Sequence, residues 1–181
     1  MGYALDKHVI SSVYIGDDQY GHPRFDTTRS KVGEAMYQLK YRDDWTQVVI
    51  LAKELADGIY PKFDNVGFLI PMPASKVRTK QPVTELTKAL GKLVGKPVYE
   101  NLLIKNPNGT QLKDMATKEE KIEILRDGFS VSDEISNMGT WNALLVDDLF
   151  DTGATLEAAC AVLRDYPKIK NLYVATLTYK R

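Results

Sequence analysis

Residues 144–157 read LLVDDLFDTGATLE, and this stretch decides the fold of the 181-residue chain. Its apolar run predicts a short buried strand that ends at Asp147 and Asp148. The turn that follows, DTGAT over residues 151–155, leads into a segment of small residues that predicts a packed helix. The order of strand, turn and helix predicts two carboxylates at the carboxyl end of a strand, beside the start of a helix.

Outward from this unit, short apolar runs alternate with amphipathic segments. Expected strands cover residues 66–70, 98–104, 128–131, 143–146 and 171–178, and expected helices cover residues 82–94, 118–125 and 154–165. Residues 106–117 contain Asn-Pro and Asn-Gly pairs and predict a loop. Strands that alternate with helices indicate an α/β fold with a mostly parallel twisted sheet flanked by helices. Ligands of such sheets bind beyond the carboxyl ends of the strands, where the two acids are expected.

The first 61 residues have a different pattern. HVISSVYI over residues 8–15 predicts a strand, and the triplets at residues 16–18 and 21–23 are turn signals. Apolar residues at helical spacing predict helices over residues 28–41 and 44–60, and Asp43 or Asp44 can cap the second. The side chains expected to face the core are Val32, Ala35, Met36, Leu39, Trp45, Val48, Val49, Ala52, Leu55, Ala56 and Ile59.

The composition excludes several classes of protein. The chain carries 24 Lys and Arg against 24 Asp and Glu, so no net positive charge attracts nucleic acid. One Cys cannot form an internal disulfide or a multi-Cys zinc site. No apolar run approaches the about 18 residues that span a bilayer. Because residues 1–6 show no basic region followed by an apolar stretch, we see no signal peptide and expect a cytoplasmic protein.

The turn has the composition of a phosphate site. Unpaired N–H groups at the start of a helix and the positive end of its dipole bind anions, and Gly153 lets the backbone approach one closely. The hydroxyl groups of Thr152 and Thr155 can donate to phosphate oxygens. Asp147 and Asp148 can accept hydrogen bonds from a ribose diol or hold the hydration shell of a magnesium ion. The alternative is an ordinary turn whose polar residues only cap the helix.

The sequence VDDLFDTGAT resembles the signature of the type I phosphoribosyltransferases, in which an apolar strand, two acids and a Thr-Gly turn follow one another. Members of this family bind 5-phosphoribosyl-1-pyrophosphate (PRPP) with Mg²⁺. The resemblance implies that Asp147 and Asp148 hold the ribose hydroxyls and the metal, and that residues 151–155 hold the 5′-phosphate. The PRPP-binding residues it implies are Asp147, Asp148, Asp151, Thr152, Gly153, Ala154 and Thr155.

Residues 66–81, VGFLIPMPASKVRTKQ, are similar to the pyrophosphate loop of the ComF-type branch of this family. Lys and Arg suit pyrophosphate because it is a dense anion. The alternative is a solvated basic loop, and the cysteine-rich zinc element usual at the N-terminus of ComF-type proteins is absent here. The residues that the resemblance turns toward pyrophosphate are Ser75, Lys76, Arg78 and Lys80.

A looser resemblance to the flexible loop of ComF-type proteins covers Lys105, Gln111, Lys118 and Lys121. The Arg and Asn usual there are replaced by Lys121 and Ile124, and each lysine can equally be a solvated surface charge. By the resemblance, a mobile loop over residues 106–121 would close over the substrate and exclude water.

In this family the acceptor base is bound by a separate segment called the hood. We place the hood in residues 1–61 and the PRPP-binding core in residues 62–181 of a single domain. Tyr14, Tyr20 and Phe25 could stack on a base there or serve only in packing.

Asp151 is the candidate catalytic residue. A carboxylate in the phosphate turn could accept a proton from a ring nitrogen of the acceptor as a general base. DTGAT and residues 175–180 resemble the branch of the family that acts on 6-oxopurines, in which a strand lysine, here Lys180, meets the purine 6-oxo group. The alternative is that Asp151 caps the helix.

The resemblance therefore implies an enzyme that transfers a phosphoribosyl group from PRPP to a nitrogen acceptor and releases pyrophosphate. The alternative is a non-catalytic regulator that binds PRPP or a nucleotide with the same fold. Expected partners are PRPP and a small-molecule acceptor, with no membrane and no strong nucleic-acid signal, and homodimer formation stays open. His8, His22 and Cys160 are assigned to structural or surface positions.

Overall fold

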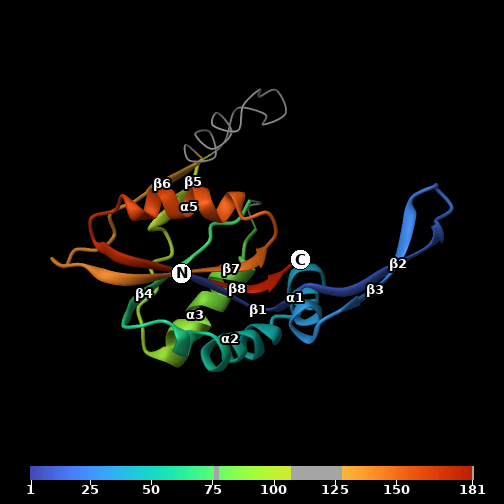
Figure 1. Ribbon diagram of the computed structural model, residues 1–181, viewed down its shortest axis with the longest axis horizontal. Helices are drawn as coiled ribbons and strands as arrows, with labels where there is room; N and C mark the ends of the chain where they lie inside the picture. Colours follow the sequence, from blue (N-terminus) through green and yellow to red (C-terminus); the bar gives the residue numbers. More distant parts are fainter. Residues whose placement is uncertain (76–77, 107–127, 181) are drawn as a thin grey trace.

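A parallel sheet forms the centre of the computed structural model, which describes residues 1–75, 78–106 and 128–180 (Figure 1). Its strands follow the order β1 (Gly2–Lys7), β8 (Ile169–Tyr179), β7 (Trp141–Phe150) and β4 (Val66–Pro71). Each neighbouring pair is parallel, and Val98 extends the sheet beyond β4 through a parallel bridge to Leu69. The predicted α/β class with a mostly parallel sheet is confirmed.

Helices lie on both faces of this sheet (Figure 1). One face carries α1 (Lys31–Tyr41), α2 (Gln47–Gly58), the short 3-10 helix η1 (Tyr60–Lys62) and α3 (Pro82–Val94), and the other carries α5 (Ala154–Arg164). In β7, Leu144 and Val146 pack toward the face with three α-helices, whereas Ala143 and Leu145 pack toward α5. Successive side chains of a strand point to opposite faces, so a strand between two helical layers needs the uninterrupted apolar run that the sequence has.

The helix α3 matches the sequence prediction at both ends. Pro82 stands in its first turn, where a missing N–H costs nothing, and Gly95 ends it with a φ of 65°. Leu86 and Leu90 are fully buried on its inner side.

The helix α1 begins in close contact with the end of β1. The Ser30 Oγ accepts a hydrogen bond from the Gly33 N–H at 3.0 Å, and the Ser30 hydroxyl donates to the Lys7 carbonyl. A Cβ atom on Gly33 would lie 2.2 Å from the His8 carbonyl oxygen. Only glycine fits this approach, which fixes α1 against the point where β1 passes into the next strand.

A two-stranded hairpin, which we call the arm, follows β1 and projects from the rest of the molecule (Figure 1). It consists of the antiparallel strands β2 (Val9–Asp17) and β3 (Pro23–Arg29). The strand expected over residues 8–15 is confirmed as part of β2. The two turns predicted at residues 16–18 and 21–23 are one turn over residues 18–22, because residues 16–17 continue β2 and Pro23 begins β3. Tyr14 and Phe25 pair across the arm with ring centroids 5.8 Å apart.

Other features differ from the prediction. Residues Gly2–Lys7, which we assigned to the hood, form an edge strand of the central sheet, because pairing with β8 outweighs their weak strand pattern. Val49, expected to face the core, is 65% exposed, because the buried face of α2 passes through Val48, Leu51, Ala52 and Leu55. The helices predicted over 28–41 and 44–60 are shorter than expected, since residues 28–29 belong to β3 and α2 begins at Gln47.

The strand expected over residues 98–104 is largely irregular. Only the bridge at Val98 and the short strand β5 (Leu103–Lys105) are present, and β5 pairs with β6 (Phe129–Val131) in an antiparallel ladder. The predicted loop and helix between residues 107 and 125 lie outside the described residues. Within the described ranges, no helix combines the length and the apolar character needed to cross a membrane.

Candidate functional site

The carboxyl ends of β4 and β7 open into a cleft of about 400 Å³. The last turn of α1 and the first turn of α3 complete its walls. Among its lining residues are Lys40, Ser75, Arg78, Asp147, Asp148 and Thr155. The cleft therefore brings together the acid pair and parts of the two loops that the sequence singled out.

The acid pair lies within the last four residues of β7, in a partly dehydrated position. Asp148 is 9% exposed and its carboxylate forms an ion pair with the ammonium group of Lys40. The Asp147 carboxylate is partly buried and accepts a hydrogen bond from the Asp148 N–H at 2.8 Å. Burial, and next the adjacent charge of Asp148, raise the pKa of Asp147 to about 7, against the opposing effect of Lys40 and Lys105. At neutral pH this site favours a bound proton or cation beside Asp147.

The turn after β7 has the geometry of an anion site. Gly153 adopts a φ of 84° at the N-cap of α5 and has no side chain to cap the helix, and the Ala154 N–H donates to the Thr152 hydroxyl oxygen at 3.5 Å. Thr152, Ala154 and Thr155 are exposed, so the first turn of α5 begins at the surface beside two hydroxyl groups. A Cβ atom on Gly153 would come within 3.0 Å of the Phe150 ring. Glycine is thus required both by φ and by space.

Asp151 and Lys180 meet at the rim of this turn. The Lys180 ammonium lies 2.6 Å from the Asp151 Oδ2, with each side chain about half exposed. The Lys180 N–H also donates to the Phe150 carbonyl at 3.0 Å, which fixes the end of the chain's last strand beside the turn. Because the N-cap of α5 is Gly153, the alternative in which Asp151 caps this helix is not observed.

The basic loop after β4 divides between two locations. The Ser75 Oγ accepts a hydrogen bond from the Lys105 ammonium at 2.7 Å, and Arg78 donates to the Lys40 carbonyl at 3.1 Å, both at the cleft. The Lys80 ammonium instead lies over the Trp45 ring, 4.2 Å from its centroid, and is not among the cleft residues. Lys76 lies outside the described residues, as do Gln111, Lys118, Lys121 and Ile124 of the loosely matched loop.

Sequence reasoning missed two neighbours of the acid pair. Lys40 was read only as part of a helix, yet it neutralises Asp148 from a position more than 100 residues away in the chain. The Thr178 hydroxyl donates to the Asp148 carbonyl at 3.0 Å, and His8 Nδ1 lies 3.0 Å from the same hydroxyl oxygen. Since a carbonyl only accepts, the Thr178 proton is used there and His8 Nδ1 must carry a hydrogen. No local pattern signals either contact.

The electrostatic surroundings of His8 keep its ring neutral. Burial first, and then the positive charges of Arg29, Lys180 and Lys40, lower the pKa of His8. A neutral ring with its hydrogen on Nδ1 can donate a hydrogen bond to the Thr178 hydroxyl oxygen. The structural assignment of His8 agrees with this geometry.

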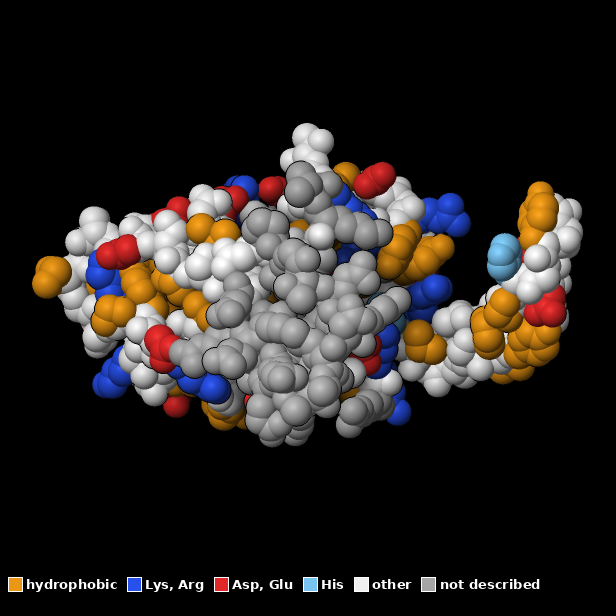
Figure 2. All heavy atoms as spheres, turned by 90° about the horizontal axis from the view of Figure 1, so that it is seen from above, with side chains coloured by type: hydrophobic (Ala, Val, Ile, Leu, Met, Phe, Trp, Pro, Cys, Tyr) orange, Lys and Arg blue, Asp and Glu red, His pale blue; other side chains and the backbone are white. Residues whose placement is uncertain are grey.

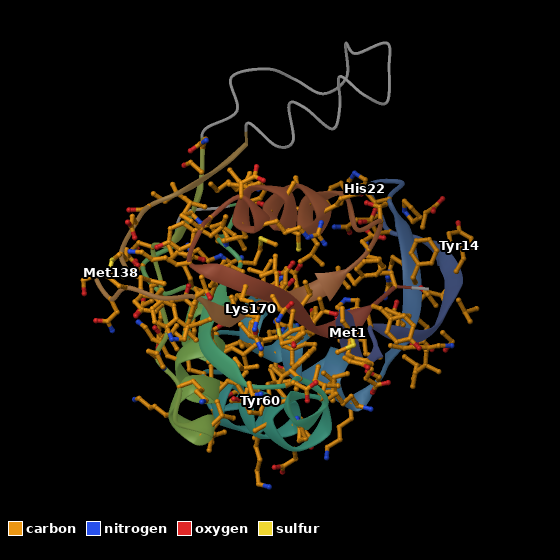
Figure 3. All side chains as sticks on the ribbon, turned by 60° about the vertical axis from the view of Figure 1, so that its left-hand side comes forward. Met1, Tyr14, His22, Tyr60, Met138 and Lys170 are labelled. Atoms are coloured by element: carbon orange, nitrogen blue, oxygen red, sulfur yellow. The ribbon has the colours of Figure 1, made fainter. Side chains whose placement is uncertain are left out.

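The aromatic residues proposed for base stacking lie on the arm. Tyr14, Tyr20 and Phe25 are 53%, 76% and 55% exposed, and none lines the cleft. Figure 3 shows Tyr14 on the arm, and Figure 1 shows that the arm projects away from the helices and the central sheet. They neither pack within a hood nor reach the chain's own acid pair.

A metal ion would have a small donor set at this site. Among the described residues, no group of three or more His, Cys, Asp and Glu side chains could hold one. Asp147 and Asp148 offer carboxylate oxygens, and the raised pKa of Asp147 reflects a charge that a cation would offset. Mg²⁺ typically binds through one or two carboxylates together with phosphate oxygens of a substrate, so the residues present fit it.

Comparison with known proteins gives matches at the level of structure alone. No protein-family model matches the chain, and no curated protein matches it. Hypoxanthine phosphoribosyltransferase from Staphylococcus aureus aligns with a TM-score of 0.43 and 13% identity, over 73% of this chain and 62% of that one. Adenine phosphoribosyltransferase from Saccharomyces cerevisiae aligns with a TM-score of 0.44 and 10% identity, over 93% and 85% of the two chains.

A third solved structure, the UMP synthase of Leishmania donovani, gives a TM-score of 0.41 and 13% identity over 90% of this chain and 27% of that one. The chain thus spans less than two thirds of the hypoxanthine enzyme and about a quarter of the UMP synthase. These values leave the function to be argued from the chain's own residues and their geometry.

Proposed function

We propose that this chain is a phosphoribosyltransferase, which binds PRPP with Mg²⁺ and transfers the phosphoribosyl group to a nitrogen acceptor with release of pyrophosphate. One observation carries the proposal: two carboxylates near the carboxyl end of β7 line an open cleft, and the turn after β7 leads through an αL glycine into the start of α5. A ligand that carries a sugar diol and a phosphate group on the same ribose needs hydrogen-bond acceptors and anion donors close together in this way.

Each part of PRPP has a place in the proposal. The 5′-phosphate is bound by the N–H groups at the start of α5 and by Thr152 and Thr155. The ribose 2′ and 3′ hydroxyls donate to Asp147 and Asp148. The pyrophosphate extends toward the loop after β4, where Arg78 lies within the same cleft.

Magnesium would be held by Asp147 or Asp148 together with oxygens of PRPP. Once bound, the ion supplies charge neutralisation for the departing pyrophosphate. Its binding would also displace the proton that the raised pKa of Asp147 retains near neutral pH, so metal and proton compete for this carboxylate.

The transfer itself breaks the bond between C1 of the ribose and the pyrophosphate oxygen and forms a bond from C1 to the acceptor nitrogen. The electron pair of the broken bond leaves with pyrophosphate, and the acceptor nitrogen loses its proton to a base. We assign this base to Asp151. Lys180, held 2.6 Å from the Asp151 carboxylate, lies where it can also donate to a carbonyl oxygen of the acceptor, which favours a 6-oxopurine.

The test is pyrophosphate release from PRPP with a panel of hypoxanthine, guanine, adenine, orotate and uracil. We expect turnover with a 6-oxopurine and its loss in Asp151→Asn, while the affinity for PRPP is retained. Asp64→Asn, which alters an exposed carboxylate just before β4, is the matched control and should leave turnover unchanged.

The outcomes separate the parts of the proposal. Turnover with only adenine or a pyrimidine would contradict the 6-oxopurine assignment. Binding of PRPP without release of pyrophosphate for any base would support a regulator in place of an enzyme. Absence of PRPP binding in calorimetry with magnesium would reject the proposed site itself.

A further inference from the structure

Lys40 reaches the acid pair from a helix that is fixed at both ends. At its start, Ser30 caps α1 and Gly33 lies close against the His8 carbonyl oxygen. At its end, the Arg78 guanidinium donates to the Lys40 carbonyl at 3.1 Å and so satisfies one of the carbonyl groups that a helix leaves unpaired in its last turn. The backbone of Lys40 is therefore held at the cleft, and its side chain, with a flexible four-carbon stem, is the part that can change partner.

The Lys40 ammonium group holds a carboxylate that the proposed function gives to the ribose and the metal. It forms an ion pair with Asp148, whose side chain is 12% exposed, while the Lys40 side chain is 32% exposed. An ammonium group and a divalent cation at contact distance on one carboxylate repel each other strongly, because little solvent separates them. Binding of a metal ion at Asp148 therefore requires that Lys40 leaves this carboxylate.

The surroundings of Lys40 are rich in positive charge. Figure 2 shows several Lys and Arg side chains on the side of the molecule next to the arm. Burial, and then three positive charges, lower the pKa of His8 at the root of the arm: those of Arg29, Lys180 and Lys40. Among the cleft-lining residues that the structure describes, the acid pair supplies the only carboxylates. A partly buried ammonium group without a counterion is unfavourable, so the next partner of Lys40 has to be an anion of the ligand.

We propose that Lys40 exchanges partners in the cleft: it holds Asp148 while the site is empty, and it passes to an oxygen of the pyrophosphate group when a divalent cation displaces it from the acid pair. This inference rests on the proposed function, since it uses the same cleft and the same ligand. Arg78, which the proposed function places beside the pyrophosphate, already lies against the Lys40 carbonyl. The displaced ammonium group thus stays close to the leaving group, where it adds a positive charge for the departing oxygen.

The exchange predicts two opposite effects for one residue. Without a phosphate ligand, Lys40 competes with a cation for Asp148 and lowers the affinity for that cation. With pyrophosphate present, the same ammonium group has a second partner and raises the affinity for pyrophosphate. A residue that served only the stability of the fold would change both affinities in the same direction.

The first experiment titrates the chain with Mn²⁺ alone and follows the free ion by electron paramagnetic resonance. Mn²⁺ shares the preference of Mg²⁺ for carboxylate ligands and serves as the probe. We expect Lys40→Met to bind the ion more tightly than the unaltered chain by about tenfold or more, because the competing charge is gone. Lys40→Arg should keep the affinity of the unaltered chain. Lys53→Met is the matched control, since Lys53 pairs with Asp57 at 2.7 Å outside the cleft.

A double variant assigns the effect to the proposed carboxylate. The gain in Mn²⁺ affinity of Lys40→Met should disappear when Asp148→Asn is added, because a neutral amide attracts the ion far less than a carboxylate does.

The second experiment measures the affinity for inorganic pyrophosphate by calorimetry with Mg²⁺ in excess. We expect Lys40→Met to bind pyrophosphate more weakly by about tenfold, as for the loss of one charge-assisted hydrogen bond. Lys40→Arg and Lys53→Met should stay close to the unaltered chain. Circular dichroism and urea unfolding check that each variant is folded, and Lys40→Gln takes the place of Lys40→Met if the latter is not.

The outcomes decide the proposal. Tighter binding of Mn²⁺ together with weaker binding of pyrophosphate in the Lys40 variant supports the exchange. An unchanged affinity for either ligand, a change of the same sign for both, or a gain in Mn²⁺ affinity that persists with Asp148→Asn overturns it. The Mn²⁺ titration contains no PRPP, so its result is independent of the absence of PRPP binding that would reject the proposed function.

Discussion

The two sides of the cleft are built in different ways. On one side, the acid pair and the phosphate turn come from one uninterrupted stretch, residues 147–155. On the other, Lys40, Arg78 and Lys105 come from three separate segments: Lys40 pairs with Asp148, Arg78 donates to the Lys40 carbonyl, and Lys105 donates to the Ser75 hydroxyl oxygen. On the side formed by residues 147–155, the contiguous side, the positions of the backbone groups follow from one glycine and the start of one helix. On the side formed by the three basic residues, the assembled side, the positions of the charges depend on tertiary packing. The difference predicts larger losses from changes on the contiguous side.

The largest effect is expected from Gly153→Val. A β-branched residue is strained at a φ of 84°, and its Cβ would meet the Phe150 ring at 3.0 Å, so the turn must move and its N–H groups no longer converge. We expect the affinity for PRPP with magnesium, measured by calorimetry, to fall by about 100-fold or more, as for the loss of several charge-assisted hydrogen bonds.

Gly95→Val is the matched control for this change. Gly95 also has a positive φ, 65°, but it ends α3 with open space around it and lies outside the cleft. The control should lower stability and leave the affinity for PRPP intact. Equal affinity in Gly153→Val and the unaltered chain would show that the turn does not bind phosphate.

The next largest effect concerns the acid pair. Hydrogen bonds to a charged group contribute about 1.5–3 kcal/mol, so Asp147→Asn and Asp148→Asn should each weaken PRPP binding by about tenfold or more at neutral pH. Inorganic phosphate, which would bind only the turn, should keep its affinity in both variants. Normal PRPP affinity in the double variant would assign the two acids another role.

The same contrast explains how much of the molecule the sequence could predict. The order of strand, turn and helix was predicted, and the helix bounds nearly to the residue, because an apolar run, a glycine and a helical pattern are all local signals. The strand predicted over residues 143–146 is longer, since pairing with β4 and β8 extends it to Trp141–Phe150. Helix α3 was predicted for the same reason, with Pro82 and Gly95 at its ends. Such local signals can be recognised in a sequence without knowledge of the tertiary contacts.

The contacts made across the fold left no such signal. The ion pair of Lys40 with Asp148 depends on the tertiary position of α1, which places Lys40 at the cleft. The sequence of a helix does not show whether one of its lysines forms such an ion pair. Strand β1 was missed because Gly2–Lys7 has few apolar residues and is defined by its pairing with β8. Lys80 was grouped with Arg78 by spacing, but Trp45 holds it outside the cleft.

That separation of Arg78 from Lys80 provides the third test. Arg78 lines the cleft and needs only to release the Lys40 carbonyl to reach a pyrophosphate, so Arg78→Ala should weaken pyrophosphate and PRPP by about tenfold. Ribose 5-phosphate, which lacks that group, should lose little. Lys80→Ala is the internal control, with an expected change below about twofold for all three ligands. Similar losses for ribose 5-phosphate would contradict the placement of pyrophosphate beside Arg78.

The smallest effect concerns the free energy of unfolding and its dependence on pH. In the folded protein the pKa of Asp147 is raised to about 7, whereas the ordinary value is 3.8. Between these two pH values the folded state binds more protons than the unfolded chain, so this carboxyl makes stability fall as the pH rises, and its full cost is present above pH 7.

Asp147→Asn removes that cost and can still accept the hydrogen bond from the Asp148 N–H. Relative to the unaltered chain, it should gain stability steadily from pH 4 to pH 7 and exceed it by at least about 1 kcal/mol at pH 8, measured by urea unfolding without ligand. Lys40→Met should act in the opposite direction, because Lys40 lowers the pKa of Asp147 and pairs with Asp148. A pH-independent difference between Asp147→Asn and the unaltered chain would mean that Asp147 titrates as an ordinary surface carboxylate. The acid pair would then be ready for a sugar diol without the aid of Lys40, and the assembled side of the cleft would serve only the leaving group.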